Sequence, residues 1–224
     1  MTSLSQSLAV ARKDLAIEFR TKESLNAAAA FSIVILLLFS FAFDLEDVKT
    51  ISGGLLWLCF AFAGALIFNR GFARELPNEC LDVLLASPLS AGSLVVGKAI
   101  TSAVLLLVVE AVSLFVFGFF YNVRWWVKPL ELVGVFVLAT WGVSIVGSVF
   151  GALTVNLRLR ELMLPVVIYP LLIPLLIAAI ELTNLALGTQ AVGEADYLWV
   201  RVLIVFDIIF TSLAIALAET ILVN

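Results

Sequence analysis

A glycine-containing segment carries the spacing that most directly suggests chemistry in this chain. Residues 92–98, GSLVVGK, fit the pattern G-x-x-x-x-G-K, in which backbone N–H groups and a lysine cradle nucleotide phosphates. That motif continues with Ser or Thr, whose hydroxyl binds magnesium, whereas Ala99 follows Lys98 here. The sequence therefore argues against nucleotide binding at this segment. We interpret its glycines as a turn that leads the chain into an apolar block, and Lys98 as an interfacial anchor.

Two acidic residues lie deep within apolar blocks. Glu110 is at the centre of one block, and Asp207 is about nine residues into another. A charge at the centre of a bilayer costs at least about 2.5–3.5 kcal/mol on insertion scales, so such residues face the helix bundle or a cavity. Two interpretations remain open for both residues. They line a pathway or act as a protonation switch, or they are neutral carboxyl groups bonded to a neighbouring helix.

The residue types that usually carry catalysis are missing or isolated. The chain has no histidine, which removes the commonest acid–base residue and the commonest metal and haem ligand. We find no nucleophile–base pair, no metal-ligand cluster and no cofactor motif in the sequence. We therefore expect no catalytic, cofactor-binding or metal-binding residue in this chain, and no enzymatic activity.

The composition indicates the elements that must position these residues. The chain is 63% hydrophobic and 13% charged, whereas soluble domains average nearer one half and one quarter. The apolar residues come in blocks that approach the roughly 20 residues needed to cross a bilayer. Backbone groups in lipid must pair internally, and these blocks lack the alternation of barrel strands. We predict an all-α polytopic membrane protein with one domain over residues 1–224, and no nucleic-acid partner.

Hydrophobic periodicity gives the expected order of helices. An amphipathic elbow helix within residues 1–26 is predicted to lie in the membrane surface, with Leu4, Leu8, Ala11, Leu15 and Phe19 on one stripe. An acidic loop is expected at 44–47 and a loop of mixed polarity at 181–197. Six membrane spans are expected at about 27–43, 51–68, 99–120, 130–155, 162–180 and 198–223.

The positive charges predict the orientation. With the N-terminus inside, nine Lys and Arg residues fall on the inner side and four on the outer side. Cytoplasmic segments carry the excess of Lys and Arg, so both termini are predicted to be cytoplasmic. The inner set is Arg12, Lys13, Arg20, Lys22, Arg70, Arg74, Lys98, Arg158 and Arg160, and the outer set is Lys49, Arg124, Lys128 and Arg201.

Residues 70–98 form a charged cytoplasmic region between the second and third spans in this arrangement. Glu75, Glu79 and Asp82 recur at helical spacing beside a narrow apolar stripe, and Ser87-Pro88 ends the pattern. The pattern predicts a short helix on the inner membrane surface whose acidic row faces the cytoplasm. The alternative is an ordinary solvated charged face.

The fifth span contains Pro165, Pro170 and Pro174. Each proline removes a backbone donor and obstructs the preceding turn, so a kinked helix is expected. The kinks serve as hinges in a moving bundle or only shape its packing, and the sequence favours neither.

Three segments together resemble a known family. They are ARKDLAIEFRTKESLN near the start, FNRGFARELPNECLDVLLASPLSAGSLVVGK in the middle, and LRLRELMLPVVIYPLLIPLLIAAI in the fifth span. The order of elbow helix, two spans, charged stretch and four further spans resembles the ABC-2 class of ABC-transporter permeases. The combination with the proline-rich span resembles, more narrowly, the CcmB family, haem exporter protein B of cytochrome c maturation.

The resemblance implies a permease subunit in the bacterial inner membrane. It would partner a separate cytoplasmic ATPase subunit (CcmA), two membrane subunits (CcmC and CcmD) and a periplasmic haem chaperone (CcmE), with two permease copies or a hetero-complex. ATP would bind the ATPase subunit, the complex would handle haem, and hydrolysis would drive release of the haem-loaded chaperone. The residues implied to couple to the ATPase are Arg74, Glu75, Glu79, Asp82, Ser87 and Pro88.

Other functions remain open at this point. An ABC-2 permease exporting a lipid, polysaccharide or drug would share most of these features. A static membrane scaffold for haem-handling proteins is a second alternative, and a proton-coupled carrier using Glu110 and Asp207 is a third.

Overall fold

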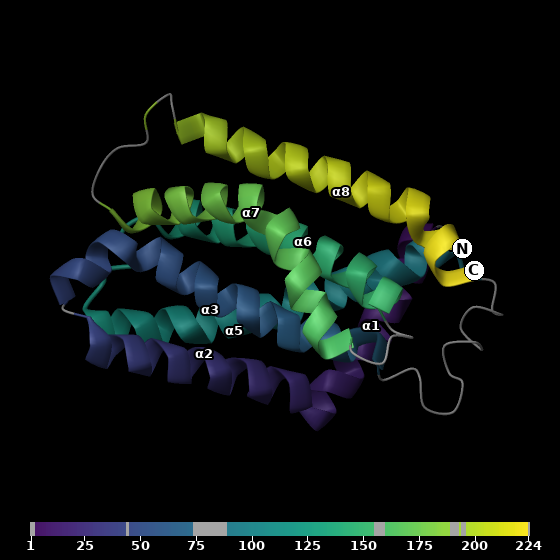
Figure 1. The fold of residues 1–224 in the computed structure, drawn as a ribbon, viewed down its shortest axis with the longest axis horizontal. Coiled ribbons are helices and arrows are strands. Elements are labelled where there is room, and N and C mark those ends of the chain that lie inside the picture. Colours follow the sequence, from purple (N-terminus) through teal and green to yellow (C-terminus); the bar gives the residue numbers. More distant parts are fainter. Residues whose placement is uncertain are drawn as a thin grey trace.

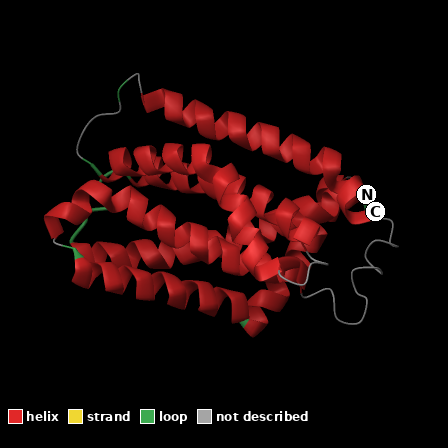
Figure 2. Cartoon of the chain, in the orientation of Figure 1, coloured by secondary structure: helices red, strands yellow, loops and turns green. Residues whose placement is uncertain are grey.

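The computed structural model describes residues 3–43, 45–73, 89–154, 160–188, 193 and 196–223, and all regular structure in them is helical (Figure 2). Six of the helices are long and apolar enough to cross a membrane. The predicted fold class, an all-α polytopic membrane protein, is confirmed. The helices are α1 (Ser3–Thr21), α2 (Glu23–Ala42), α3 (Leu45–Ala73), α5 (Ala91–Tyr121), α6 (Pro129–Thr154), α7 (Arg160–Leu187) and α8 (Tyr197–Val223).

The spans form a bundle with α2 and α8 at opposite sides (Figure 1). In the same view α1 lies at the end of the bundle where the marked chain termini are found. We call this the α1 end, and α3 ends and α5 begins there. Of the six spans, α3 and α6 are the most enclosed by protein, while α2 and α8 are the least enclosed.

Helices α5 and α6 form the centre of the bundle. Helix α5 contacts α1, α2, α3, α6 and α8, while α6 contacts α3, α5, α7 and α8. Within the core the rings of Trp57, Phe60 and Phe136 meet edge to face, with centroids 5.4–5.9 Å apart. Such edge contacts add to the dispersion attraction of tightly packed helices, which is the main cohesive force within lipid.

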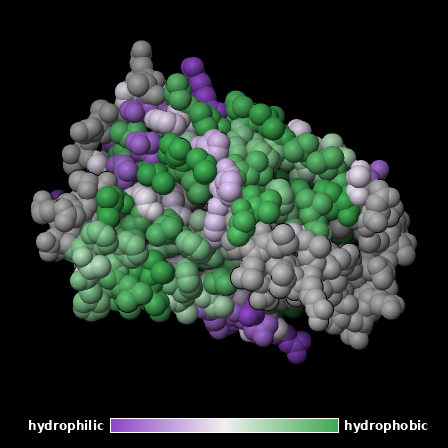
Figure 3. Space-filling view, viewed as in Figure 1, coloured by the Kyte–Doolittle hydropathy of each residue, from purple (hydrophilic) through white to green (hydrophobic). Residues whose placement is uncertain are grey.

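The outer surface suits a lipid environment. Hydrophobic residues form the largest connected area of described surface in the space-filling view (Figure 3). Exposed large apolar side chains include Phe41 on α2, Leu130 on α6, Val166 on α7 and Ile208 on α8. A soluble protein rarely exposes apolar area on this scale, so these faces are the lipid-contacting surface of the spans.

Two turns expected from the sequence are helical in the structure. The acidic loop expected at 44–47 is wrong for residues 45–47, because α3 already begins at Leu45. The glycine turn expected at residues 92–98 is also wrong, because Gly92 and Gly97 lie inside α5. Ser90 starts this helix instead, and its side chain accepts a hydrogen bond from the Ser93 N–H at 3.2 Å.

The fifth span is longer than expected. The sequence placed a loop at 181–197, whereas α7 continues to Leu187 and α8 begins at Tyr197. The extra turns carry Thr183 and Asn184, whose polarity suggested a loop. Both side chains instead accept hydrogen bonds from α3 and are therefore compatible with a helix inside the bundle.

Candidate functional site

Helix α1 docks on α5 through small side chains. A Cβ atom added at Gly97 would lie 2.7 Å from Val10 Cβ and 2.8 Å from the Ser7 carbonyl oxygen. Ser93 Oγ also donates to the Ser3 carbonyl oxygen at 3.1 Å. The larger Leu4 and Leu8 of the apolar stripe stay exposed. The buried residues of α1 are Ser7, Val10, Ala11 and Glu18. Ala11 and Leu15 of the predicted apolar stripe therefore pack on the bundle, whereas Leu4, Leu8 and Phe19 face away from it.

Lys98 connects three helices at this end of the bundle. Its ammonium lies 2.8 Å from Asp14 Oδ2 on α1 and donates to the Gly71 carbonyl oxygen on α3 at 2.9 Å. The nitrogen also lies 5.5 Å from the centre of the Phe72 ring. Only 4% of the Lys98 side chain is exposed, so its charge depends on these partners. Lys98 is a buried structural contact, rather than the surface anchor that the sequence suggested.

Glu18 fixes the corner between α1 and α2. Its side chain is buried, and Oε1 accepts hydrogen bonds from the backbone N–H groups of Ser24 at 2.7 Å and Leu25 at 3.0 Å. These are N–H groups of the first turn of α2, which have no partner within the helix. Lys22 makes the corner by adopting a left-handed conformation with φ 55°. The carboxylate therefore acts as a cap for α2, supplied from the preceding helix.

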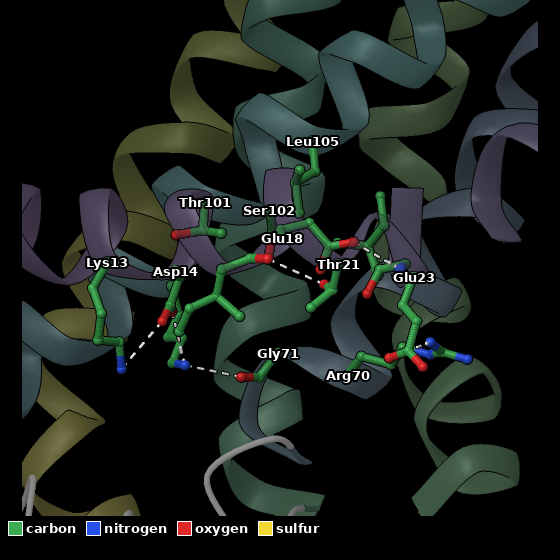
Figure 4. Close-up of a pocket in the computed structure, with 14 residues that line it drawn as sticks. Lys13, Asp14, Glu18, Thr21, Glu23, Arg70, Gly71, Thr101, Ser102 and Leu105 are labelled. Atoms are coloured by element: carbon green, nitrogen blue, oxygen red, sulfur yellow. Dashed lines mark hydrogen bonds and ion pairs between the residues drawn. The ribbon is translucent and has the colours of Figure 1, made fainter. Parts of the chain in front are cut away.

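These contacts surround a pocket, which we call the junction pocket (Figure 4). Its volume is about 400 Å³, and it is lined by α1, the start of α2, α3 and α5. Arg70 and Glu23 form an exposed ion pair beside it, with Arg70 Nη1 and Glu23 Oε2 3.3 Å apart. The charged residues among the described lining are Lys13, Asp14, Glu18, Glu23, Arg70 and Lys98.

The residues predicted to couple to an ATPase lie outside the described residues. Arg74, Glu75, Glu79, Asp82, Ser87 and Pro88 all belong to this set. The helices on either side of the set are described, and Lys98 joins them through its bond to the Gly71 carbonyl oxygen. Lys98 therefore ties the two described helices that flank these residues to each other, and its ion pair with Asp14 ties both to α1.

Glu110 lies on α5 in the middle of the bundle and is fully buried. Thr140 Oγ1 on α6 donates to Glu110 Oε1 at 2.6 Å, while Oε2 has no hydrogen-bond partner among the described residues. The bond is the arrangement expected of a carboxyl group that holds two helices together. The buried hydroxyls of Ser113 and Ser144, one turn away on the two helices, also have no described partner.

Asp207 is separate from this contact and belongs to the α6–α8 interface. The residue is buried, and a Cβ atom added at Gly142 would lie 2.5 Å from Asp207 Oδ1. Gly142 therefore makes the space in which the carboxyl group sits. The neighbouring bond between α6 and α8 runs from Trp141 Nε1 to Thr211 Oγ1 at 3.0 Å.

Helix α7 bends part-way along its length (Figure 1). All three prolines lie within the helix, and the described side chains are those of Pro170 and Pro174. Each removes a backbone hydrogen bond from the helix, which accounts for a bend in this region. The two halves of α7 can therefore tilt relative to each other more easily than the halves of an unbroken helix.

The half of α7 after the prolines is tied to α3 by a set of contacts that we call the outer clamp. Trp57 Nε1 donates to Thr183 Oγ1 at 2.9 Å, and the Gly53 N–H donates to Asn184 Oδ1 at 2.7 Å. A Cβ atom at Gly53 would lie 2.6 Å from the Ile180 carbonyl oxygen, so the two backbones approach closely. Polar side chains in lipid gain from such bonds because their alternative partners are few.

A comparison with protein families matches the CcmB protein model to residues 5–223. The chain belongs to the CcmB family. This confirms the resemblance inferred from the sequence. The six spans, the described lining of the junction pocket and the outer clamp all fall within the matched range.

Curated relatives of this CcmB-family chain carry the name heme exporter protein B. The Paracoccus denitrificans protein is 29% identical over 171 residues, which are 75% of this chain and 78% of the relative. The Rhodobacter capsulatus protein is 28% identical over 182 residues, or 79% and 81% of the two chains. The Pseudomonas aeruginosa protein is 28% identical over 221 residues, 94% of each chain.

Sequence reasoning found some functional candidates of this CcmB-family chain and missed others. Glu110 and Asp207 stood out as carboxyl groups in apolar blocks, and the structure places them at different helix interfaces. The roles of Asp14 and Glu18 were missed because charges on an amphipathic helix usually face water. A signal was present in Gly97 and Ser7, whose small size permits the close approach that buries these carboxylates.

Proposed function

We propose that this chain is the transmembrane permease subunit of an ABC transporter for cytochrome c maturation. A separate CcmA-like ATPase subunit hydrolyses ATP, and CcmC-like and CcmD-like membrane subunits complete the complex. The permease couples hydrolysis to haem delivery through release of the haem-loaded, CcmE-like periplasmic chaperone. Membership of the CcmB family and the names of the curated relatives support this assignment.

The single observation that favours mechanical coupling is the position of Lys98. It joins α1, the end of α3 and the start of α5. These last two helices flank residues 74–88, which we propose to contain the helix that docks on the ATPase. Force applied at that segment therefore enters α5, the helix with contacts to most of the bundle. In this arrangement the α1 end is cytoplasmic, in agreement with the distribution of Lys and Arg.

The residue types of the chain favour coupling over haem ligation. With no histidine, the chain offers no imidazole to haem iron. Cys59 is buried in α3, and burial in apolar surroundings suits a structural thiol. We therefore propose that no cofactor binds this chain, that ATP binds the partner subunit, and that other members of the complex handle haem.

Charge reversal tests the docking proposal. Glu79→Lys with Asp82→Lys should reduce co-purification of the ATPase by about tenfold or more, because repulsion replaces attraction at the contact. The matched control, Glu131→Lys with Glu181→Lys, reverses two exposed charges elsewhere on the chain. Membrane-extracted complexes are compared for bound ATPase and for ATP hydrolysis. Unchanged assembly and unchanged hydrolysis in the Glu79/Asp82 variant would reject the docking site.

The same purification separates the remaining alternatives. A permease for a lipid, polysaccharide or drug would bring an ATPase without CcmC-like and CcmE-like proteins. A static scaffold would bring the haem-handling proteins, but its conformation would not respond to nucleotide. A proton-coupled carrier would act with no ATPase present, and Glu110→Gln would abolish its transport.

A further inference from the structure

We infer that the junction pocket binds the headgroup of a phosphoethanolamine lipid. The inference does not depend on the proposed function, because it uses only the geometry and charge of the pocket. It assigns a ligand to a site that a permease subunit would carry in addition to its coupling contacts.

The pocket has the size and position of a headgroup site. Its volume of about 400 Å³ falls in the range of small-molecule sites. It lies where the apolar spans α2, α3 and α5 meet the charged helix α1, which places it at a membrane–water boundary. Ile17, Ile67 and Leu105 supply apolar lining beside the charged groups. A molecule with a charged head and an apolar body fits both parts of this lining.

The charges of the pocket favour a zwitterion. Among the described lining residues, the cations Lys13, Arg70 and Lys98 are balanced by the carboxylates of Asp14, Glu18 and Glu23. An anionic headgroup would gain from the cations but would also lie near all three carboxylates. A headgroup with a phosphate and an ammonium can place each charge beside its opposite.

The exposed pair at the mouth provides the two contacts. Arg70 and Glu23 lie 3.3 Å apart with 44% and 69% of their side chains exposed, so their mutual attraction is weak. They can separate at little cost and pair with a ligand instead. The Arg70 guanidinium suits a phosphate because it donates two parallel hydrogen bonds. The Glu23 carboxylate suits a primary ammonium, which carries three donors.

The lining also distinguishes ethanolamine from choline. A quaternary ammonium has no N–H donor and is recognised by aromatic side chains. Among the described residues that line the pocket none is aromatic, while carboxylates that accept hydrogen bonds are present. The lining therefore suits the primary ammonium of phosphoethanolamine and not the quaternary ammonium of phosphocholine.

Native mass spectrometry of the full-length, detergent-purified protein tests the inference. The protein is titrated with phosphatidylethanolamine, phosphatidylcholine and phosphatidylglycerol that carry identical acyl chains. We expect phosphatidylethanolamine to bind at least about tenfold more tightly than either of the others. Arg70→Gln and Glu23→Gln should each weaken that binding by about tenfold, whereas Arg201→Gln, which removes an exposed charge from α8, should not.

Competition on the unmodified protein keeps the test decisive if a variant fails to fold. Soluble glycerophosphoethanolamine in excess should displace the bound lipid, because the contacts that distinguish the three lipids are made by the headgroup. Three results would overturn the inference: equal retention of the three lipids, tightest binding of phosphatidylglycerol, or no competition by the soluble headgroup. Equal losses in Arg70→Gln and Arg201→Gln would overturn it as well.

Discussion

Lys98 holds a positive charge at a place where little of its side chain meets solvent. Two oxygen atoms compensate the charge, one from the Asp14 carboxylate and one from the Gly71 carbonyl. Removing one member of a buried pair leaves the other charge without compensation, which costs more than the pair itself contributes. The three-helix contact at Lys98 is therefore sensitive to single substitutions and tolerant of a matched double substitution.

Lys98→Met should lower the free energy of unfolding by about 3 kcal/mol, because Asp14 stays largely buried and loses its buried cationic partner. Asp14→Asn combined with Lys98→Met should recover more than half of that loss. Lys13 also lies 3.2 Å from Asp14, but its side chain is 42% exposed, so Lys13→Met should cost less than about 1 kcal/mol. Unfolding in detergent, followed by circular dichroism, gives these values. Equal losses for Lys13→Met and Lys98→Met would contradict the buried-pair account.

For individual residues, the sequence predicted which carboxyl groups are buried in the spans better than it predicted the side chains that bond to them. Glu110 was recognisable because a carboxyl group is rare in an apolar block. Its partner, Thr140, was not recognisable, because threonine is common in membrane helices and the bond depends on how α5 and α6 align. Asp14 and Glu18 looked like solvated residues because their burial arises only when α1 docks on the bundle.

Helix α1 depends on a glycine in another helix. Gly97→Ala would bring a Cβ atom to 2.7 Å from Val10 Cβ and 2.8 Å from the Ser7 carbonyl oxygen, so α1 would have to move outward. We expect a loss of about 1–3 kcal/mol in the stability of this contact. Amide hydrogen exchange in α1 should accelerate accordingly, while exchange in α6 should not change. The control is Gly54→Ala in α3, where a Cβ atom would meet nothing within 4 Å. Unchanged protection of α1 in the Gly97 variant would show that the close approach is unimportant.

The order and type of the helices followed from apolar block length, which is a strong signal in a membrane protein. The ends of the helices were not predicted correctly, and particular residues show why. Gly92 and Gly97 suggested a turn, but both lie in α5 against another helix, Gly92 beside Ile215 of α8 and Gly97 beside α1. Thr183 and Asn184 suggested a loop, but α3 supplies donors for both side chains. Both errors come from contacts between helices, which local sequence does not reveal.

The whole bundle combines a constrained end with a deformable one. Trp57 and the Gly53 backbone tie α3 to the late part of α7, and Lys128 Nζ adds a bond of 3.3 Å to the Leu185 carbonyl oxygen. The prolines separate this part of α7 from its earlier half, near the α1 end. A force applied at the α1 end should therefore tilt the first half of α7 and leave its second half in place.

Distances measured by electron paramagnetic resonance between spin labels test this division in the assembled complex. One pair, Ala30→Cys with Val166→Cys, reports on the half of the bundle nearer the α1 end, and the other, Phe41→Cys with Glu181→Cys, reports on the opposite half. All four positions are exposed, so the labels fit outside the bundle. Addition of a non-hydrolysable ATP analogue should shift the first distance and leave the second unchanged, because Val166 lies in the half of α7 nearer the α1 end, whereas Glu181 lies in the half held by the outer clamp. Gly53→Leu should release the clamp and let the second distance shift as well, since its side chain would overlap the Ile180 carbonyl oxygen.

Two outcomes would contradict this division of the bundle. Equal shifts of the two distances in the protein with Gly53 intact would show that α7 does not bend at its prolines. No shift of either distance would favour a static scaffold.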